Sequence, residues 1–584
     1  MASSRAPDRL PHAGLLILLA WLACAGAMLW LFHGGFATLA FRDPDDAMRL
    51  QQVRDWIGGQ GFFDISQHRV SPPTGGPMHW SRIVDMPVAA LILLLRPLLG
   101  AGMAEIAACI AVPLLLLGGL CAALFVAAER LGCAKIALVA VLLLLITPSI
   151  LVQFTPLRID HHGWQIAMAA IALCGAVDPR PARGGAVAGL AIAVWLQISS
   201  EGLPYAALFG GLFGLRYIAT RDHGPRFLSY AAVLGGAALM LLIATRGGQA
   251  AFGRQCDALS AAYVWPLVGF AVATPLAAAL LGSATPIRRL AVAAIGGGCA
   301  LLILLATGGP CLTGDPFRAL GPLAYQHWYL QVMEGRPLWE QERAMAGILL
   351  LPVLAGLAGT LAAAKSNAAR RGDWLALALL LVGATLVAVM VMRAMGVAHL
   401  LALPGIAWLM SRGFVAAQAS RHALARVAGS VALIAVTPVG LSAIWIALVP
   451  PAEKPAKARA DCRAAATLAP LRALPPGTLF APIDMGPDIL VRTRHSVIAT
   501  AHHRNAAGIT AVITGFMAPP DQAHAVIRRV DADYVVTCPG LSEFTLYGKK
   551  RPASLAAMLA HGGTPPWLVP LPTKGPLRLY RVVE

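Results

Sequence analysis

The chain has 584 residues, of which 58% are hydrophobic and only 13% are charged. A soluble protein carries roughly 25% charged residues, so this composition excludes a soluble protein and indicates a polytopic protein of a lipid bilayer. The net charge is +18, but the basic residues lie in short loops between apolar segments and are not interleaved with aromatic residues. That distribution argues against a nucleic-acid partner and follows the positive-inside rule.

Thirteen apolar segments are predicted as transmembrane helices, for which about 20 apolar residues are typical. A shorter run at 88–99 is interrupted by Arg96 and Pro97, so we predict an interfacial or re-entrant helix there. The thirteen predicted spans lie at 14–32, 104–128, 136–152, 164–177, 186–198, 203–220, 227–244, 262–281, 290–306, 346–363, 374–392, 397–410 and 428–449.

The charges in the loops predict the orientation. With the N-terminus in the cytoplasm, every inner loop carries Lys or Arg, beginning with Arg130 and Lys135. We therefore expect a multi-pass protein of the bacterial inner (plasma) membrane. Residues 1–449 would form a membrane domain with outer loops at 35–103 and 308–343.

Residues 450–584 follow the last predicted span and are expected on the periplasmic side. A strand-like run at 533–537 and a helical pattern at 521–530 predict a small mixed α/β domain. Four of the ten cysteines fall in predicted outer segments. An oxidising compartment would allow the pairs Cys256–Cys311 and Cys462–Cys538, although spacing alone proves neither.

Three carboxylates, those of Asp43, Asp45 and Asp46, follow the first predicted span directly. Pro44 suits the first position of a helix, and acidic residues in a first turn complement the helix dipole. The segment is therefore either a capped juxtamembrane helix or part of a metal and phosphate site. We interpret Asp46 only as a helix-start residue.

Other outer-face groups favour the metal site. Asp160 and His162 lie two residues apart on one stretch, and Glu334 lies in the loop 308–343. Hard carboxylate oxygens with one imidazole suit Mg²⁺ or Mn²⁺ better than zinc. Glu201 is predicted to be a solvated loop residue. His502 and His503 are predicted at the surface or in a groove.

Five motifs in this order resemble those of the STT3/AglB/PglB oligosaccharyltransferases, which are membrane glycosyltransferases of the GT-C class. The segment 43–49 is similar to their Asp-Pro-Tyr-Tyr-Asn-Tyr-Arg motif, and 160–162 to their Asp-His-His motif. The stretch 332–337 resembles Ser-Val-x-Glu-His-Gln-Pro, Arg393 lies where the family has a phosphate-binding arginine, and 482–486 falls where the family has Trp-Trp-Asp-Tyr-Gly. The resemblance spans nearly the whole chain.

This resemblance implies a GT-C fold and glycan transfer from a polyprenyl-(pyro)phosphate donor to an acceptor protein, lipid or glycan. It implies that Mg²⁺ or Mn²⁺ is bound by Asp43, Asp160, His162 and Glu334. Asp43 and Glu334 would be catalytic and would orient the acceptor, and Arg393 would bind the donor phosphate. Asp484 and Gly486 would line the acceptor groove.

The departures from the family motifs keep other functions open. Both tryptophans of Trp-Trp-Asp-Tyr-Gly are replaced, by Pro482 and Ile483, and its tyrosine by Met485. One alternative is a transferase that passes a single sugar from polyprenyl phosphate to a lipid or polysaccharide. Another is a non-enzymatic transporter or scaffold, which the absence of an internal repeat and the position of the acidic groups at span ends disfavour.

Overall fold

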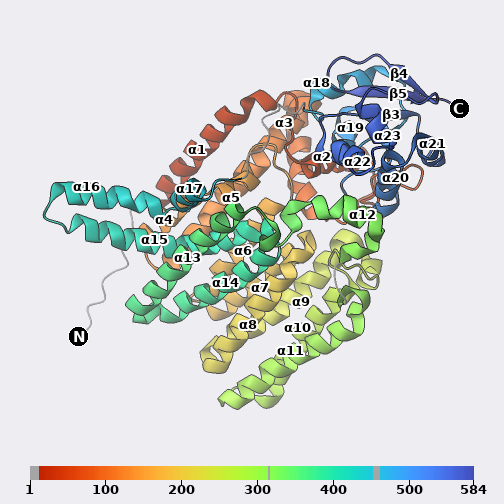
Figure 1. The fold of residues 1–584 in the computed structure, drawn as a ribbon. Coiled ribbons are helices and arrows are strands. Elements are labelled where there is room, and N and C mark those ends of the chain that lie inside the picture. The colour runs from red at the N-terminus through yellow and green to blue at the C-terminus, as the bar shows by residue number, and fades with distance from the viewer. Residues whose placement is uncertain (1–11, 313–315, 452–460) are drawn as a thin grey trace, which may run out of the picture.

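The computed structural model describes residues 12–312, 316–451 and 461–584. A body of long helices carries a smaller mixed domain at one end, and the hairpin of α15 and α16 projects from the opposite side (Figure 1). The helices of the body are α1 (Ala13–Phe32), α3 (Arg82–Leu131), α4 (Ala134–Leu144), α5 (Pro148–Leu151), α6 (His162–Ala176), α7 (Pro181–Ile198), α8 (Leu203–Ala219), α9 (Gly224–Arg246), α10 (Ala261–Leu281), α11 (Pro286–Gly308), α13 (Arg343–Ser366), α14 (Arg371–Met390), α15 (Met395–Gln418), α16 (Ala423–Ala432) and α17 (Pro438–Leu448).

The predicted class, a helical multi-pass membrane protein, is confirmed, and every predicted span falls on helix. Within the described residues, nine helices are long and apolar enough to cross a membrane, or eleven if two bent pairs each count as one span. Those pairs are α4 with α5 and α16 with α17. The predicted number of thirteen is not reached on this criterion, because α6 and α8 have only 15 and 17 residues.

The predicted break before the second span is present. α3 contains two helices that meet at Gly100, whose φ of 75° and ψ of 166° interrupt the helical backbone. A positive φ of this kind favours glycine, which has no Cβ to clash. The first of these helices includes the run 88–99, and Leu93, Leu94 and Leu98 on it are exposed.

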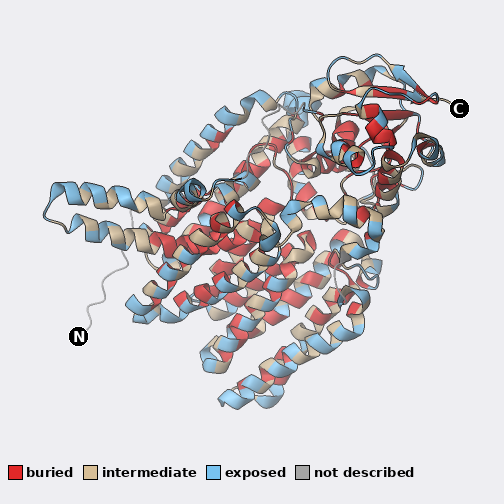
Figure 2. Cartoon of the chain, in the orientation of Figure 1, coloured by how far each residue is buried: buried red, intermediate tan, exposed pale blue. Residues whose placement is uncertain are grey.

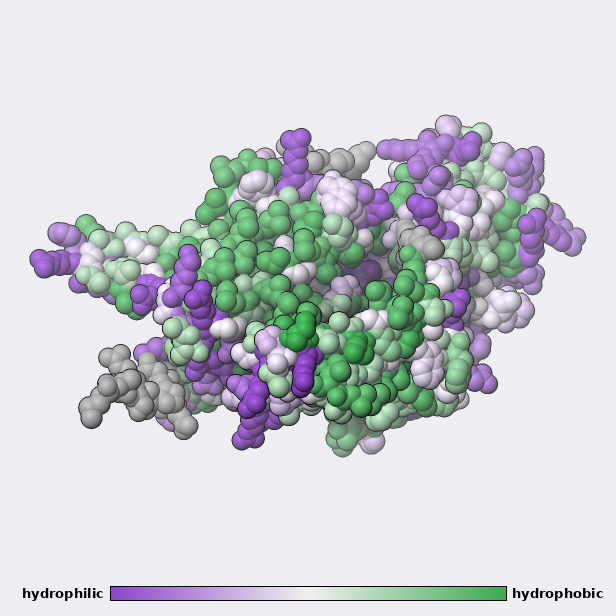
Figure 3. Space-filling model, turned by 90° about the horizontal axis from the view of Figure 1, so that it is seen from below, coloured by the Kyte–Doolittle hydropathy of each residue, from purple (hydrophilic) through white to green (hydrophobic). Residues whose placement is uncertain are grey.

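Small residues allow close packing in the body. A Cβ at Gly356 or Gly405 would overlap the facing helix where α13 crosses α15, and one at Gly185 would overlap the backbone of α9. Such contacts are typical of membrane helices, which gain stability by van der Waals packing. Buried residues fill the centre of the body, while α1 and α16 are largely exposed (Figure 2). Seen from below, hydrophobic side chains cover the helices broadly, and hydrophilic ones gather on the C-terminal domain (Figure 3).

The C-terminal region is a mixed α/β domain, as predicted. Its sheet has the order β2-β1-β3-β5-β4, with β1 parallel to β2 and β3, and β5 antiparallel to β3 and β4. Its strands are β1 (Thr478–Phe480), β2 (Ser496–Val497), β3 (Tyr534–Thr537), β4 (Leu568–Leu571) and β5 (Arg578–Val582). Its helices are α18 (Ala465–Leu468), α19 (Gly486–Arg492), α20 (Ala506–Met517), α21 (Pro520–Arg529), α22 (Ser542–Lys550) and α23 (Leu555–Ala560).

Both predicted disulfides, Cys256–Cys311 and Cys462–Cys538, are formed. The outer segments share hydrophobic cores with the C-terminal domain. Met48 of α2 (Pro44–Ile57) and Trp80 pack in one core with residues of the sheet, and Ala324 of α12 (Gly321–His327) packs in another. These contacts position the site described next. The predicted domain boundary at 449/450 adjoins residues 452–460, which lie outside the described part of the chain, as do residues 313–315 of the loop 308–343.

Candidate active site

The N-terminus of α2 is capped as its sequence predicts. The Asp43 carboxylate accepts a hydrogen bond of 3.0 Å from the Asp45 amide, and Pro44 occupies the first helical position. A side-chain oxygen at this position satisfies one of the free N–H groups of the first turn. The Asp43 side chain is 29% exposed. Asp43 therefore caps the helix while part of its side chain stays accessible to solvent.

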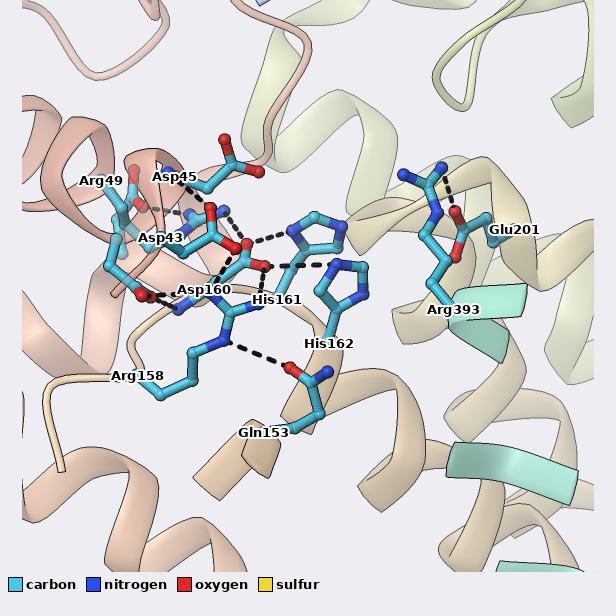
Figure 4. Close-up of polar contacts among 12 residues, drawn as sticks. Asp43, Asp45, Arg49, Gln153, Arg158, Asp160, His161, His162, Glu201 and Arg393 are labelled. Atoms are coloured by element: carbon cyan, nitrogen blue, oxygen red, sulfur yellow. Dashed lines mark hydrogen bonds and ion pairs between the residues drawn. The ribbon is translucent and has the colours of Figure 1, made fainter. Parts of the chain in front are cut away.

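Arg158 joins the carboxylates of this region. Its Nη1 lies 2.8 Å from Asp43 Oδ2 and 3.0 Å from Asp46 Oδ2, and its Nη2 lies 3.5 Å from Asp160 Oδ2. Figure 4 shows Asp43 and Asp160 pointing toward this guanidinium, whose Nε donates a hydrogen bond to Gln153. Sequence reasoning missed Arg158, although its position two residues before Asp160 was a signal. One fixed cation thus offsets part of the negative charge that the three carboxylates bring together.

Asp46 is a buried member of this network, so the interpretation of Asp46 as a mere helix-start residue is wrong. Its side chain is 1% exposed, and its Oδ1 accepts a hydrogen bond of 2.9 Å from the Asp160 amide. Burial raises the pKa of Asp46 to about 8, although Arg158 opposes the shift. Asp46 therefore fixes the backbone at Asp160 relative to α2.

Asp160, His161 and His162 could hold a metal ion. Their ligand atoms lie within 4.8 Å of one another, and all three residues are buried. Asp160 pairs closely with His161 Nδ1, and His162 Nε2 lies 3.4 Å from Asp160 Oδ2. In the described part of the chain, Asp160 Oδ2 makes no hydrogen bond. This oxygen lies 3.4 Å from His162 Nε2 and 3.5 Å from Arg158 Nη2, and His161 lies at the other oxygen, so the carboxylate and the two imidazoles together could bind a divalent cation.

The two histidines differ in electrostatics. Burial disfavours the charged ring in both, and it lowers the pKa of His162 to about 4. At His161 the adjacent Asp160 carboxylate outweighs burial and raises the pKa. His162 is therefore neutral at physiological pH, which is the form in which an imidazole binds a metal.

Arg393 and Glu201 form a second, partly buried pair, and the carboxylate oxygens of Glu201 are buried, so the prediction that Glu201 is solvated is wrong. Glu201 lies in the 3₁₀ turn Ser200–Gly202 and contacts Arg393 Nη2 directly. Glu334 lies 3.8 Å from Arg393 Nη1 and is 46% exposed. Partial removal from water raises the pKa of Glu334 to about 7, Arg393 opposes the shift, and the nearby carboxylates, Asp43 among them, add to it. In Figure 4 the pair Glu201–Arg393 lies to one side of the Arg158 network.

The structure brings only part of the predicted metal-ligand set into one group. Of the four predicted ligands, Asp160 and His162 belong to the compact group of ligand atoms found among the described residues. Asp43 is linked to them through Arg158, and Glu334 contacts Arg393. His161, which was not predicted as a ligand, joins the group. The sequence offered the signal, since His161 lies between the two predicted ligands.

The predicted acceptor segment packs beside α2. Gly486 is buried, and a Cβ there would overlap the carbonyl oxygen of Ala499, so this position requires glycine. The amides of Ile483 and Asp484 donate hydrogen bonds of 2.9 and 3.1 Å to the Glu543 carboxylate. Burial raises the pKa of Glu543 to about 8 and also raises that of Asp484. No sequence pattern indicated Glu543, which lies 60 residues after Ile483 and 59 after Asp484.

His502 is buried and not at the surface. Its Nε2 lies 3.4 Å from Asp45 Oδ1, and its ring meets that of Trp80 edge to face at 4.9 Å. Burial lowers the pKa of His502 to about 3. On the other side of Trp80, the Arg49 guanidinium lies 4.4 Å from the ring centroid. These residues form the wall between the acidic cluster and the C-terminal domain.

An apolar cavity of about 350 Å³ lies between α8 and α14. Its wall includes Pro204 at the start of α8 and Val387 near the end of α14. Glu201 precedes α8 directly, and Arg393 follows α14 by three residues. The cavity therefore lies between two helices that adjoin Glu201 and Arg393 in the chain. A chain of apolar groups would fit this lining, with a polar head at the pair.

No protein-family model matches this chain, and no curated protein matches it in sequence. Solved structures do. The archaeal oligosaccharyltransferase AglB from Archaeoglobus fulgidus, in complex with an inhibitory peptide and a dolichol-phosphate, matches with a TM-score of 0.68 and 14% identity, over 96% of this chain and 73% of that one. This chain has the fold of an oligosaccharyltransferase.

Two further structures of the Archaeoglobus fulgidus oligosaccharyltransferase agree. The apo form matches with a TM-score of 0.63 over 90% of this chain and 69% of that one. The complex with Zn and sulfate matches with a TM-score of 0.57 over 92% and 70%, and both have 14% identity. At this identity the likeness concerns the fold, and the site has to be argued from its own residues.

Proposed function

We propose that this protein is a membrane glycosyltransferase that moves a glycan from a polyprenyl-(pyro)phosphate carrier to an acceptor at the outer face of the bacterial inner membrane. The observation that carries the proposal is a juxtaposition. The Asp160–His161–His162 cluster and the partly buried pair Arg393–Glu201 lie beside each other, and an apolar cavity lies along α8 and α14, the helices that adjoin this pair in the chain. A lipid-linked sugar needs these three features together: a place for its tail, a cation for its phosphate and carboxylates near its reacting carbon.

The donor would lie with its prenyl tail along α8 and α14 and its phosphate at Arg393. A guanidinium presents paired N–H donors that match phosphate oxygens. Arg393 already has one partner in Glu201, and its contact with Glu334 is long, at 3.8 Å. A phosphate can therefore replace Glu334 at Arg393 while Glu201 keeps the guanidinium in place.

A divalent ion such as Mg²⁺ or Mn²⁺ is proposed at Asp160 and His162, with Asp43 and Glu334 as the further predicted ligands. His161 belongs to the same group and would be a ligand or orient Asp160. When bound, such an ion supplies charge that stabilises a phosphate leaving group. A solved neighbour is a complex with Zn and sulfate, which supports a cation in this fold.

Asp43 is proposed to orient the acceptor nucleophile and, if the acceptor is a hydroxyl, to accept its proton. Its carboxylate is part-exposed and held by two contacts, one to the Asp45 amide and one to Arg158. These contacts fix the geometry that general-base catalysis needs. Asp484 and Gly486 would line the acceptor groove, Asp484 with its side chain and Gly486 by permitting the close approach of the backbone.

A second candidate is transfer of a single sugar to a lipid or polysaccharide. Glu543 occupies the amides of Ile483 and Asp484, so these donors are not available to a peptide carbonyl. The replacement of both tryptophans of the family motif points the same way. A non-enzymatic scaffold would not need a partly buried arginine and several carboxylates at the outer ends of its helices.

Mass spectrometry of periplasmic glycoproteins and glycolipids from cells with and without the gene tests the function. Loss of a glycoprotein identifies an oligosaccharyltransferase, loss of a glycolipid or polysaccharide identifies the second candidate, and unchanged glycans contradict both. Reporter tags test the orientation. Tags after Ala364 and Arg412 should report the cytoplasm, and a tag at Glu584 should report the periplasm. A periplasmic signal at Ala364 would contradict the shared outer face.

A further inference from the structure

A second group of metal-ligating side chains lies outside the proposed active site. His79, Asp257 and His503 each offer a ligand atom, and these atoms lie within 4.8 Å of one another. They come from three segments far apart in the sequence: the loop before α3, the loop between α9 and α10, and the C-terminal domain. Such a meeting of three segments is a feature of the tertiary fold, and no motif in the sequence predicts it.

The three ligand atoms lie close enough to one another to surround one ion. His503 Nε2 lies 2.7 Å from Asp257 Oδ2, and the rings of His79 and His503 have centroids 4.5 Å apart. Zinc binds imidazole nitrogen and carboxylate oxygen at about 2.0–2.2 Å, which puts tetrahedral ligand atoms about 3.4 Å apart. A bound ion would replace the direct hydrogen bond between His503 and Asp257, whose two atoms would then move apart to that spacing.

Two further features favour an ion here. The Nδ1 atom of His79 is buried and has no hydrogen-bond partner among residues 12–312, 316–451 and 461–584. Arg504 donates to both oxygens of Asp257, at 2.7 and 2.8 Å, and so fixes the plane of that carboxylate. Metal-binding carboxylates are commonly oriented by a hydrogen-bonding neighbour in this way.

We propose that His79, Asp257 and His503 form a second divalent-metal site, separate from the Asp160 cluster and selective for ions of the zinc class. Two imidazoles and one carboxylate suit zinc, whereas Mg²⁺ and Ca²⁺ prefer oxygen ligands. The site rests on geometry alone and does not depend on the proposed glycosyltransferase function. Three protein ligands leave a fourth position for water.

The position of this site suggests what it does. Trp80 and His502 face the acidic cluster, while the adjoining His79 and His503 face Asp257. The Asp257 carbonyl accepts a hydrogen bond from Ser200, the residue before Glu201. An ion here would therefore clamp the C-terminal domain, the first outer loop and the turn that carries Glu201. The disulfide at Cys256 ties the same loop to Cys311.

The test counts metal ions in the full chain purified in detergent. All further substitutions are made in the Asp160→Asn/His162→Asn variant, called the background, which removes metal binding by the Asp160 cluster. After chelation, loading with Zn²⁺ and desalting, we expect one zinc per chain by mass spectrometry of the metal. Adding His79→Asn and His503→Asn should remove it. His561→Asn, the same substitution at an exposed histidine of the same domain, should keep it.

Melting in Zn²⁺ gives a second readout. Zinc should raise the melting temperature of the background and of the His561→Asn control, but not that of the chain without His79 and His503. His503→Cys replaces one zinc ligand by another and should retain the ion. Absence of zinc from the background would overturn the proposal whether or not the histidine variants fold. Equal zinc content with and without His79 and His503 would also overturn it, and an equal shift with Mg²⁺ would overturn the zinc class.

Discussion

Arg158 and Arg393 are both guanidiniums placed among carboxylates near the ends of membrane helices, but their surroundings differ. Arg158 contacts three aspartates, and the side chains of two of them, Asp46 and Asp160, are 1% exposed. Arg393 contacts one largely buried glutamate, Glu201, and lies 3.8 Å from Glu334, which is 46% exposed and carried by a loop. The first cation is enclosed by its partners. The second can exchange one of its partners.

Because of this difference, one part of the site can be rigid while another part binds a substrate. Buried ion pairs are costly to break, because removal of one partner leaves an uncompensated charge. The Arg158 network is therefore suited to holding Asp43 and Asp160 in place. A half-exposed partner at long range costs little to displace, so Arg393 is suited to receiving a substrate phosphate.

The largest expected effect is that of Asp43→Asn, which keeps the size and removes the charge. Turnover with a polyprenyl-linked donor should fall by about 10²–10⁴, the range usual for positioned acid–base groups. Asp64→Asn is the matched control, because Asp64 lies on the same outer segment, is 39% exposed and pairs with His68. Equal activities of the two variants at matched expression would refute the assignment of Asp43.

Arg393→Lys should raise the KM for the donor by about 10- to 100-fold. Hydrogen bonds between charged groups contribute about 1.5–3 kcal/mol, and lysine cannot reproduce the two-pronged contact. Arg336→Lys serves as the control, since Arg336 also pairs with a glutamate, Glu340, but both lie in the loop 308–343. A change in kcat alone, with KM constant, would place Arg393 outside the donor phosphate site.

Asp46→Asn should destabilise the fold by about 1–3 kcal/mol, because two buried donors, Arg158 Nη1 and the Asp160 amide, bond separate oxygens of Asp46 and asparagine offers only one oxygen. The helix-dipole effect alone would have been about 0.3–1 kcal/mol. The measurement is the melting temperature in detergent, with Asp64→Asn again as control. Equal melting of the two variants would mean that the network around Arg158 does not hold α2 in place.

The smallest expected effect is on the pH profile. Because burial raises the pKa of Glu334 from its ordinary 4.5 to about 7, Glu334 is mostly protonated at pH 6 and mostly ionised at pH 8. If the carboxylate is the active form, activity should rise about tenfold over that interval. The raised pKa also means that the contribution of Glu334 to stability falls as pH rises from about 4.5 to 7.

Glu334→Gln should remove this limb of the profile together with most of the activity, and Glu340→Gln in the same loop should leave the limb in place. A limb that persists in the residual activity of Glu334→Gln belongs to another group, such as Asp45, whose pKa burial raises to about 8.

Much of the fold could be predicted from the sequence, because it depends on local patterns. Apolar runs placed every membrane helix, and Pro44 after Asp43 predicted the cap of α2. The alternation of residues after 450 predicted a mixed domain, and cysteines in outer segments predicted both disulfides. Lengths were less certain: α6 and α8 are shorter than a typical span, since packing against neighbours decides where a helix ends.

The sequence was sufficient to predict the membrane helices and the residue types near their ends, because hydropathy and charge are local properties. The tertiary structure alone decided their roles. Asp46 became buried because Arg158, 112 residues away, folds onto it, and Glu201 left solvent because Arg393 reaches it. The charge state and function of a carboxylate depend on its partners and its exposure to water, and both are set by segments distant in the chain.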